Sequence, residues 1–136
     1  MDKESQEEIM YKFSMFEQQI QQLQQQLQAI EQTITEMNSL NFGLDDLKGS
    51  KGKEILAPIG RGVFTKTKLD SEKLIVDIGG KNFVEKSISE TKEIIKEQIG
   101  KLENAKKEIE NSTEEINKEL TKLMLEVQKG EKEHKH

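Results

Sequence analysis

The stretch from Glu54 to Lys86 most constrains the fold, because it cannot continue a long helix and it divides the chain into two arms of similar length. It holds four short runs rich in β-branched or aromatic residues, at 55–59, 63–69, 74–78 and 82–86. Turn sequences separate these runs, and Gly60, Gly62, Gly79 and Gly80 allow the positive φ angles that tight turns need. The pattern predicts two consecutive β-hairpins.

Two hairpins in about thirty residues leave strand edges unpaired and cannot close a core, so they should be only marginally stable alone. Pro58 agrees with this reading, because proline is tolerated on edge strands and at strand starts. We therefore expect the strands to assemble with strands of other subunits. The apolar residues expected to make this contact are Ile55, Leu56, Ile59, Val63, Phe64, Leu74, Val76, Ile78, Phe83 and Val84.

The composition is too polar for a compact globular domain: of 136 residues 35% are charged, and the mean hydropathy is -0.78. Regular spacing of the apolar residues argues against disorder and favours an elongated fold. The net charge of -5 comes from interspersed acids and bases, so no basic stripe indicates nucleic-acid binding. No apolar run approaches the roughly twenty residues of a membrane span, and the first residues begin no signal peptide. We expect a cytoplasmic protein that binds no membrane.

The first arm carries a heptad repeat, because its apolar residues recur at alternating steps of four and three. One seam position holds Phe13, Ile20, Leu27, Ile34 and Asn41, and the other holds Ile9, Phe16, Leu23, Ile30, Met37 and Leu44. Between Glu17 and Glu31 the remaining positions are almost all glutamine. This favours a solvated helix face, with a prion-like or protein-contacting surface as the alternative.

The second arm opens with Ser87 and Glu90, which form a capping box and predict a helix from Ile88. Its seam consists of Ile88, Ile95, Leu102, Ile109, Ile116 and Leu123, with Ile99, Leu120 and Val127 at the second position. Gly130 should end this helix. The sequence thus predicts one domain over residues 1–136, with a helix at 5–47, hairpins at 54–86, a helix at 87–129 and a polar tail at 130–136.

The two arms match in one antiparallel register, in which Ile9 faces Val127, Phe13 faces Leu123 and Met37 faces Ile99. A lysine at the mixed layer of Ile30 with Lys106 can lay its stem along the seam and keep its ammonium in water. This register predicts an intramolecular coiled coil with both termini at one tip. Met10, Met15, Met124 and Leu125 lie off the seam at that tip. They form either an ordinary fraying end or an adaptable surface for non-native apolar partners.

Chemical sites are not expected in this chain. Lys48 to Lys53 superficially resembles a phosphate loop, but Leu47 stands where the first glycine is needed and Glu54 where a Ser or Thr should hold magnesium. The chain has no Cys, and its two histidines, His134 and His136, lie in the polar tail. The sequence therefore predicts no enzyme, no cofactor and no metal site.

The strand segments resemble a known family. Ile55 to Phe64, Leu74 to Gly79 and Val84 to Ser87 are similar in order and spacing to the strand core of alpha-class subunits of prefoldin, the archaeal and eukaryotic co-chaperone. The resemblance covers nearly the whole chain, and two hairpins favour the alpha class because beta-class subunits have one. It implies an α+β fold: a long antiparallel α-helical coiled-coil hairpin with two central β-hairpins that assemble into an intersubunit β-barrel.

The same resemblance implies a hetero-hexamer with beta-class subunits, which holds unfolded or nascent polypeptides at its coiled-coil tips without ATP and passes them to a group II chaperonin. The tip residues expected to contact these clients are Ile9, Met10, Phe13, Phe16, Leu120, Leu123, Met124 and Val127. The alternative is a structural protein of the same architecture, whose hairpins self-associate into open filaments that grow with concentration.

Overall fold

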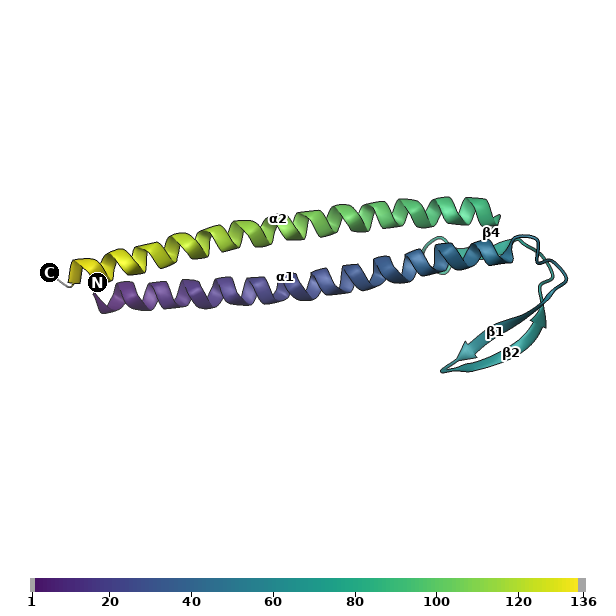
Figure 1. The fold of residues 1–136 in the computed structure, drawn as a ribbon, viewed down its shortest axis with the longest axis horizontal. Coiled ribbons are helices and arrows are strands. Elements are labelled where there is room, and N and C mark those ends of the chain that lie inside the picture. The colour runs from purple at the N-terminus through teal and green to yellow at the C-terminus, as the bar shows by residue number, and fades with distance from the viewer. Residues whose placement is uncertain (1, 135–136) are drawn as a thin grey trace. The chain divides into compact units, whose positions relative to one another are not determined.

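The computed structural model describes residues 2–134, with side chains described for residues 2–130. The elements follow the order helix, two strand pairs, helix: α1 (Lys3–Leu44), a short 3-10 helix η1 (Asp45–Leu47), β1 (Glu54–Gly60), β2 (Val63–Lys68), β3 (Leu74–Asp77), β4 (Phe83–Lys86) and α2 (Ile88–His134) (Figure 1). This order confirms the predicted fold class. The predicted assembly of the strands into a barrel between subunits stays a prediction.

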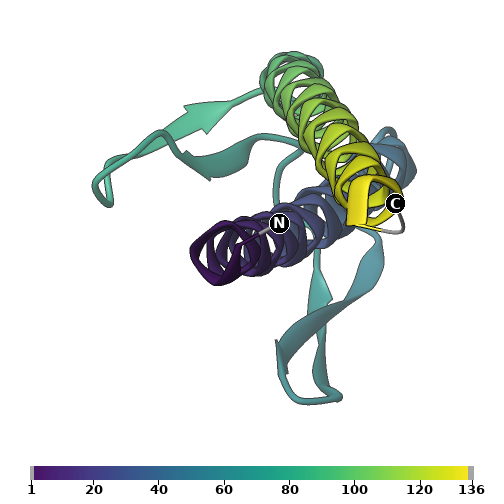
Figure 2. The same cartoon turned by 90° about the vertical axis from the view of Figure 1, so that its left-hand side faces the viewer.

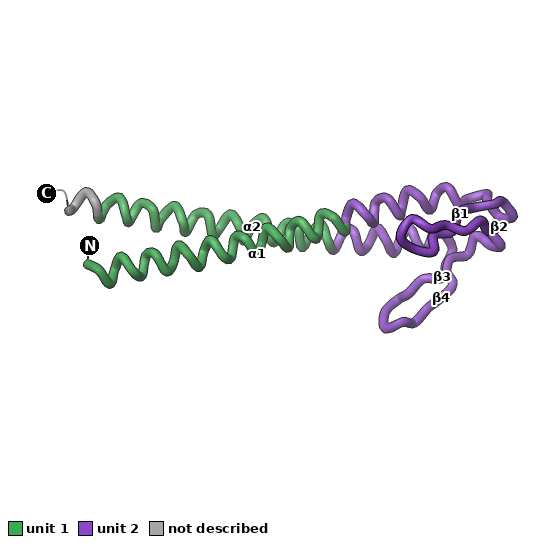
Figure 3. Tube along the Cα trace, turned by 90° about the horizontal axis from the view of Figure 1, so that it is seen from below, with its two compact units in different colours: residues 1–33, 102–136 green, residues 34–101 purple. Residues whose placement is uncertain are grey.

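The chain divides into two compact units, coloured separately in Figure 3. Unit 1 consists of residues 1–33 and 102–136, which are the first part of α1 and the last part of α2. Unit 2 consists of residues 34–101, which are the remaining parts of both helices and all four strands.

The heptad positions of α1 lie on its less exposed side. Every seam residue from Ile9 to Leu44 is half-buried or buried, whereas the residues between them, with the exception of Thr33, are exposed. A single apolar stripe on an otherwise polar helix can be buried only against one partner. In unit 1 that partner is α2, where the Lys106 ammonium forms an ion pair with Glu31 at 3.6 Å. Glu31 adjoins Ile30, which the antiparallel register places opposite Lys106.

The start of α2 confirms the predicted capping box. The Ser87 hydroxyl accepts a hydrogen bond from the backbone N–H of Glu90 at 3.0 Å, and the Glu90 carboxylate accepts one from the backbone N–H of Ser87 at 3.2 Å. The two bonds satisfy backbone donors that a helix start otherwise leaves unpaired. The bond from the backbone N–H of Ser87 to the Glu90 carboxylate, and secondly the nearby Ser87 hydroxyl, lower the pKa of the Glu90 carboxyl.

The predicted end of α2 at Gly130 is wrong, because the helix continues through this glycine to His134. A glycine costs only about 1 kcal/mol relative to alanine inside a helix. Extending a helix that already exists needs no new nucleation, so one glycine does not stop it. Of the predicted polar tail, residues 135 and 136 lie outside the described residues, as does the side chain of His134.

The strands form two separate two-stranded antiparallel sheets, β1 with β2 and β3 with β4. Gly60 pairs with Val63, and Arg61 and Gly62 between them have φ angles of 50° and 80°. Positive φ at both loop residues is typical of a type I′ turn, which suits the twist of a hairpin. The second hairpin turns at Gly79, Gly80 and Lys81, where all three φ angles are positive. In unit 2 the two hairpins point in different directions (Figure 2).

The core of unit 2 lies where α1, α2 and the second hairpin meet. Leu44, Ile88 and Ile95 are its buried residues, and Met37, Leu47, Leu74 and Ile99 pack against them. The cluster contains Met37 and Ile99, which the predicted register places opposite each other. No described side chain is less than 2% exposed, so the single chain has a thin core. Much of its apolar surface stays exposed.

Candidate functional site

The first hairpin leaves one face uncovered. Leu56 pairs with Lys66 and Pro58 with Phe64, and residues paired across an antiparallel sheet point to the same side. All four are exposed. The register shifts between Pro58 and Gly60, and beside this bulge Ile59 and Val63 are also exposed. Such an apolar face on a sheet with two free edges is typical of a surface that another chain covers.

The second hairpin has one half-covered face and one open face. Val76 pairs with Val84 and Leu74 with Lys86 on the half-buried face, and Leu74 belongs to the core of unit 2. Val76 lines a groove of about 390 Å³ together with helix residues of its own chain. The open face carries Ile75 and Phe83, which are 73% and 62% exposed.

Ile75 is missing from the residues expected to contact other subunits. In the run from Leu74 to Ile78, one phase of the strand holds Leu74, Val76 and Ile78, and the other holds Ile75 and Asp77. This alternation favours the first phase as the buried face, but it does not say whether the chain itself or another subunit covers that face. In the structure the face of the strand that carries Leu74 and Val76 is half-buried, and Ile75 on the other face is exposed. The available signal was Ile75 itself, a large apolar residue in the phase that it shares with Asp77.

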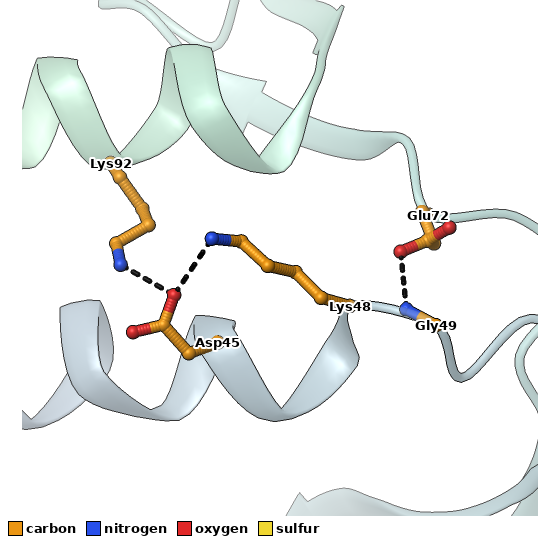
Figure 4. A network of polar contacts seen from close by, with 5 residues as sticks. All are labelled: Asp45, Lys48, Gly49, Glu72 and Lys92. Atoms are coloured by element: carbon orange, nitrogen blue, oxygen red, sulfur yellow. Dashed lines mark hydrogen bonds and ion pairs between the residues drawn. The ribbon is translucent and has the colours of Figure 1, made fainter.

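A polar network anchors the helices of unit 2 beside the hairpins (Figure 4). The Asp45 carboxylate accepts hydrogen bonds from the ammonium groups of Lys92 on α2 and Lys48, the latter at 3.1 Å. Across the linker, the backbone N–H of Gly49 donates to the Glu72 carboxylate at 2.8 Å. These bonds join η1 to α2 and the linker before β1 to the segment before β3. They hold the base of both hairpins.

Asp45→Asn will lower the thermal unfolding midpoint at neutral pH, because the ion pairs with Lys92 and Lys48 are lost. Lys92 first and then Lys48 lower the pKa of the Asp45 carboxyl from its ordinary 3.8. A group with a lowered folded-state pKa adds stability above its unfolded pKa, and this stability is lost as the pH falls through the folded pKa. The difference from wild type should therefore disappear at a pH well below 3.8.

Asp46→Asn is the matched control for this measurement, because among the described residues the Asp46 carboxylate makes no ion pair. Its unfolding midpoint should follow that of the wild type more closely at neutral pH. Equal midpoints for Asp45→Asn and Asp46→Asn, or a difference that persists in acid, would contradict the anchoring role of Asp45.

The open end of unit 1, where α1 begins and α2 approaches its end, carries the second candidate surface (Figure 1). Of the eight tip residues that the sequence singles out, Ile9, Phe13, Phe16, Leu120 and Val127 are half-buried and Leu123 is buried. Met10 and Met124 are the members with large exposure, at 72% and 54%. The seam residues pack between the helices, so they can meet a partner fully only if the helices separate.

The structure adds Tyr11, which is exposed, to this surface. Met15 and Leu125, which the sequence already places off the seam at the tip, are exposed as well. Tyr11 and Met15 line a groove of about 520 Å³ between the helices, with Phe16 and Leu123. Tyr11 and Met15 are four residues apart and share a helix face beside the seam. The signal in the sequence was apolar residues in excess of the heptad.

Among the described residues, no group of three or more His, Cys, Asp or Glu side chains could hold a metal ion. No described helix is long and apolar enough to cross a membrane.

The chain is similar to archaeal proteins along most of its length. A family model described as "Prefoldin subunit" matches residues 16–133. Prefoldin subunit alpha 1 of Methanocaldococcus jannaschii is 33% identical over 114 residues, which are 83% of this chain and 78% of that protein. Prefoldin subunit alpha of Methanococcus vannielii is 31% identical over 130 residues, which are 95% of this chain and 87% of that protein.

The fold has a counterpart among solved structures. A chain from the cryo-EM structure of filamentous PFD from Methanocaldococcus jannaschii superposes with a TM-score of 0.77 at 23% identity. The match covers 85% of this chain and 98% of that chain. At this identity the likeness concerns the fold. Together with the family match, it confirms the resemblance found in the sequence: the chain belongs to the prefoldin subunit family, and the two relatives named above are archaeal alpha subunits.

Proposed function

We propose that this chain is the alpha-class subunit of a hetero-hexameric co-chaperone of the cytoplasm. It assembles with beta-class subunits through its hairpins, holds non-native polypeptides at its helical tip without ATP, and passes them to a group II chaperonin. Membership in the prefoldin subunit family supports the co-chaperone role. The observation that supports the assembly and holding steps is the large apolar surface that the single chain leaves exposed on its hairpins and at the end of unit 1.

The hairpins support the assembly step. The two hairpins expose seven large apolar side chains, and two-stranded sheets are marginal in water unless further strands or another surface cover them. These side chains are Leu56, Ile59, Val63, Phe64, Ile75, Ile78 and Phe83. Pairing the free edges with strands of other subunits would satisfy the backbone groups and bury these side chains together.

The tip supports the holding step. Met10, Met15 and Met124 are unbranched and polarisable, so they repack against apolar partners of different shapes at low cost. Association by apolar burial needs no nucleotide, because its driving force is the removal of apolar surface from water.

Mixing the purified chain with an archaeal beta-class subunit will give a complex of one defined mass, which native mass spectrometry or light scattering can measure. The complex should suppress aggregation of a chemically denatured client in the absence of ATP. The beta-class subunit alone is the control. Assemblies whose size grows with concentration would instead indicate an open filament. A defined complex that gives no protection would contradict the holding step.

A further inference from the structure

The open end of unit 1 holds most of the chain's excess negative charge. Residues 2–17 of α1 contain five carboxylates and two lysines, and residues 114–130 of α2 contain four carboxylates and three lysines. The excess of carboxylates here is thus four, against five for the whole chain. Since the Debye length is about 8 Å at physiological salt, charges clustered at one end act on a partner bound there and not on distant parts.

The groove between the helices combines this charge with apolar side chains. Tyr11, Met15, Phe16 and Leu123 provide its apolar lining, and Glu8 and Glu126 also line it. Glu119 already forms an ion pair with Lys122 at 3.7 Å. Among the described residues, neither Glu8 nor Glu126 forms an ion pair. Two carboxylates are therefore available beside an apolar lining, with Lys12 as the one unpaired cation in the groove.

Tyr11 adds a third recognition element. Its side chain is 67% exposed and belongs to the same groove as the two carboxylates. An exposed aromatic ring attracts cations through its π face, and arginine stacks on such rings more readily than lysine. An aromatic ring with flanking carboxylates suits an arginine whose neighbours are large apolar residues.

From this arrangement we propose that the groove selects non-native segments in which a basic residue, above all arginine, adjoins a large apolar or aromatic residue. The inference rests on the proposed holding function and names the class of client that this end of the chain prefers. The apolar lining provides affinity for any unfolded segment. Glu8, Glu126 and Tyr11 favour the cationic ones over the acidic ones.

Three labelled peptides of equal length will test the preference. They share one core of leucine and phenylalanine and are flanked by arginine, by serine or by glutamate. Binding to the assembled full-length chain is measured by fluorescence anisotropy at low and at high salt. The arginine peptide should bind roughly threefold more tightly than the serine peptide at low salt, since exposed charge pairs contribute modestly. The glutamate peptide should bind least, and high salt should reduce these differences.

The double variant Glu8→Gln/Glu126→Gln should bind all three peptides with more nearly equal affinity. Glutamine has a helix propensity close to that of glutamate, so both helices persist. Glu103→Gln/Glu110→Gln is the matched control, because it removes two exposed carboxylates of α2 that do not line the groove. It should keep the preference of the wild type.

The outcomes separate this proposal from the holding function. If the serine peptide binds to the wild type as tightly as the arginine peptide does, the proposed charge preference is wrong, but the proposed holding function is unaffected. If the preference persists unchanged in Glu8→Gln/Glu126→Gln, the groove is not its source. If no peptide binds and no client is protected from aggregation, the holding function itself fails.

Discussion

A chain that lacks residues 1–15 and 122–136 will still assemble but will no longer protect a denatured client from aggregation. This truncation removes the exposed tip residues Met10, Tyr11, Met15, Met124 and Leu125. It keeps the seam from Ile20 to Leu44 and leaves all four strands unchanged. Apolar capture weakens by about 25 cal/mol for each Å² of apolar surface that is no longer buried. Losing five large side chains should therefore remove almost all of the protection.

Aggregation assays on assemblies of equal concentration, with circular dichroism to verify the helices, will measure this effect. Met10→Ser/Met124→Ser is a milder companion variant, which should reduce protection in part because only two of the exposed side chains change. If the truncated and complete assemblies protect equally, clients bind elsewhere, and the glutamine-rich face between Glu17 and Glu31 becomes the next surface to test.

Phe64→Asp will abolish assembly while leaving the helical content of the chain nearly unchanged. Phe64 is 57% exposed in the single chain, so a charge at this position disturbs little within the chain itself. In an assembly that buries this face, an unpaired carboxylate costs several kcal/mol. Mass measurement of the variant with a beta-class subunit, beside its circular dichroism spectrum, separates the two effects.

Thr65→Asp is the control for this substitution, because Thr65 pairs with Ala57 and so points to the other side of the same hairpin. It should affect assembly less than Phe64→Asp. Val76→Asp should also abolish assembly, but Val76 is partly covered by its own chain and lines the groove with Leu44 and Ile95. In Val76→Asp the loss of assembly would therefore be accompanied by weaker packing of the second hairpin on the helices of unit 2. A Phe64→Asp variant that assembles normally would show that the exposed hairpin face is not the interface.

The sequence by itself determined the features that depend on local interactions. The heptad step predicts which side of α1 is buried, the pair Ser87 and Glu90 predicts where α2 begins, and the glycines at the turns predict both hairpins. Each depends on residues within a few positions of one another, so the chain's own spacing is sufficient. The antiparallel register also follows from the sequence, because two apolar stripes bury each other well in few alignments.

The tertiary structure alone decided which apolar residues stay exposed. Ile75 is open and Leu74 is covered because one face of the second hairpin packs on the helices. The alternation separates the two residues, but it does not say that the helices of the same chain cover the face of Leu74. The contact between α1 and α2 buries or half-buries the seam residues of the tip. The large apolar side chains that stay exposed there include Met10, Tyr11 and Met124. The bond between Asp45 and Lys92 joins residues 47 positions apart. Burial and long-range pairing are properties of the packed helices and strands, so they arise only when separate elements meet.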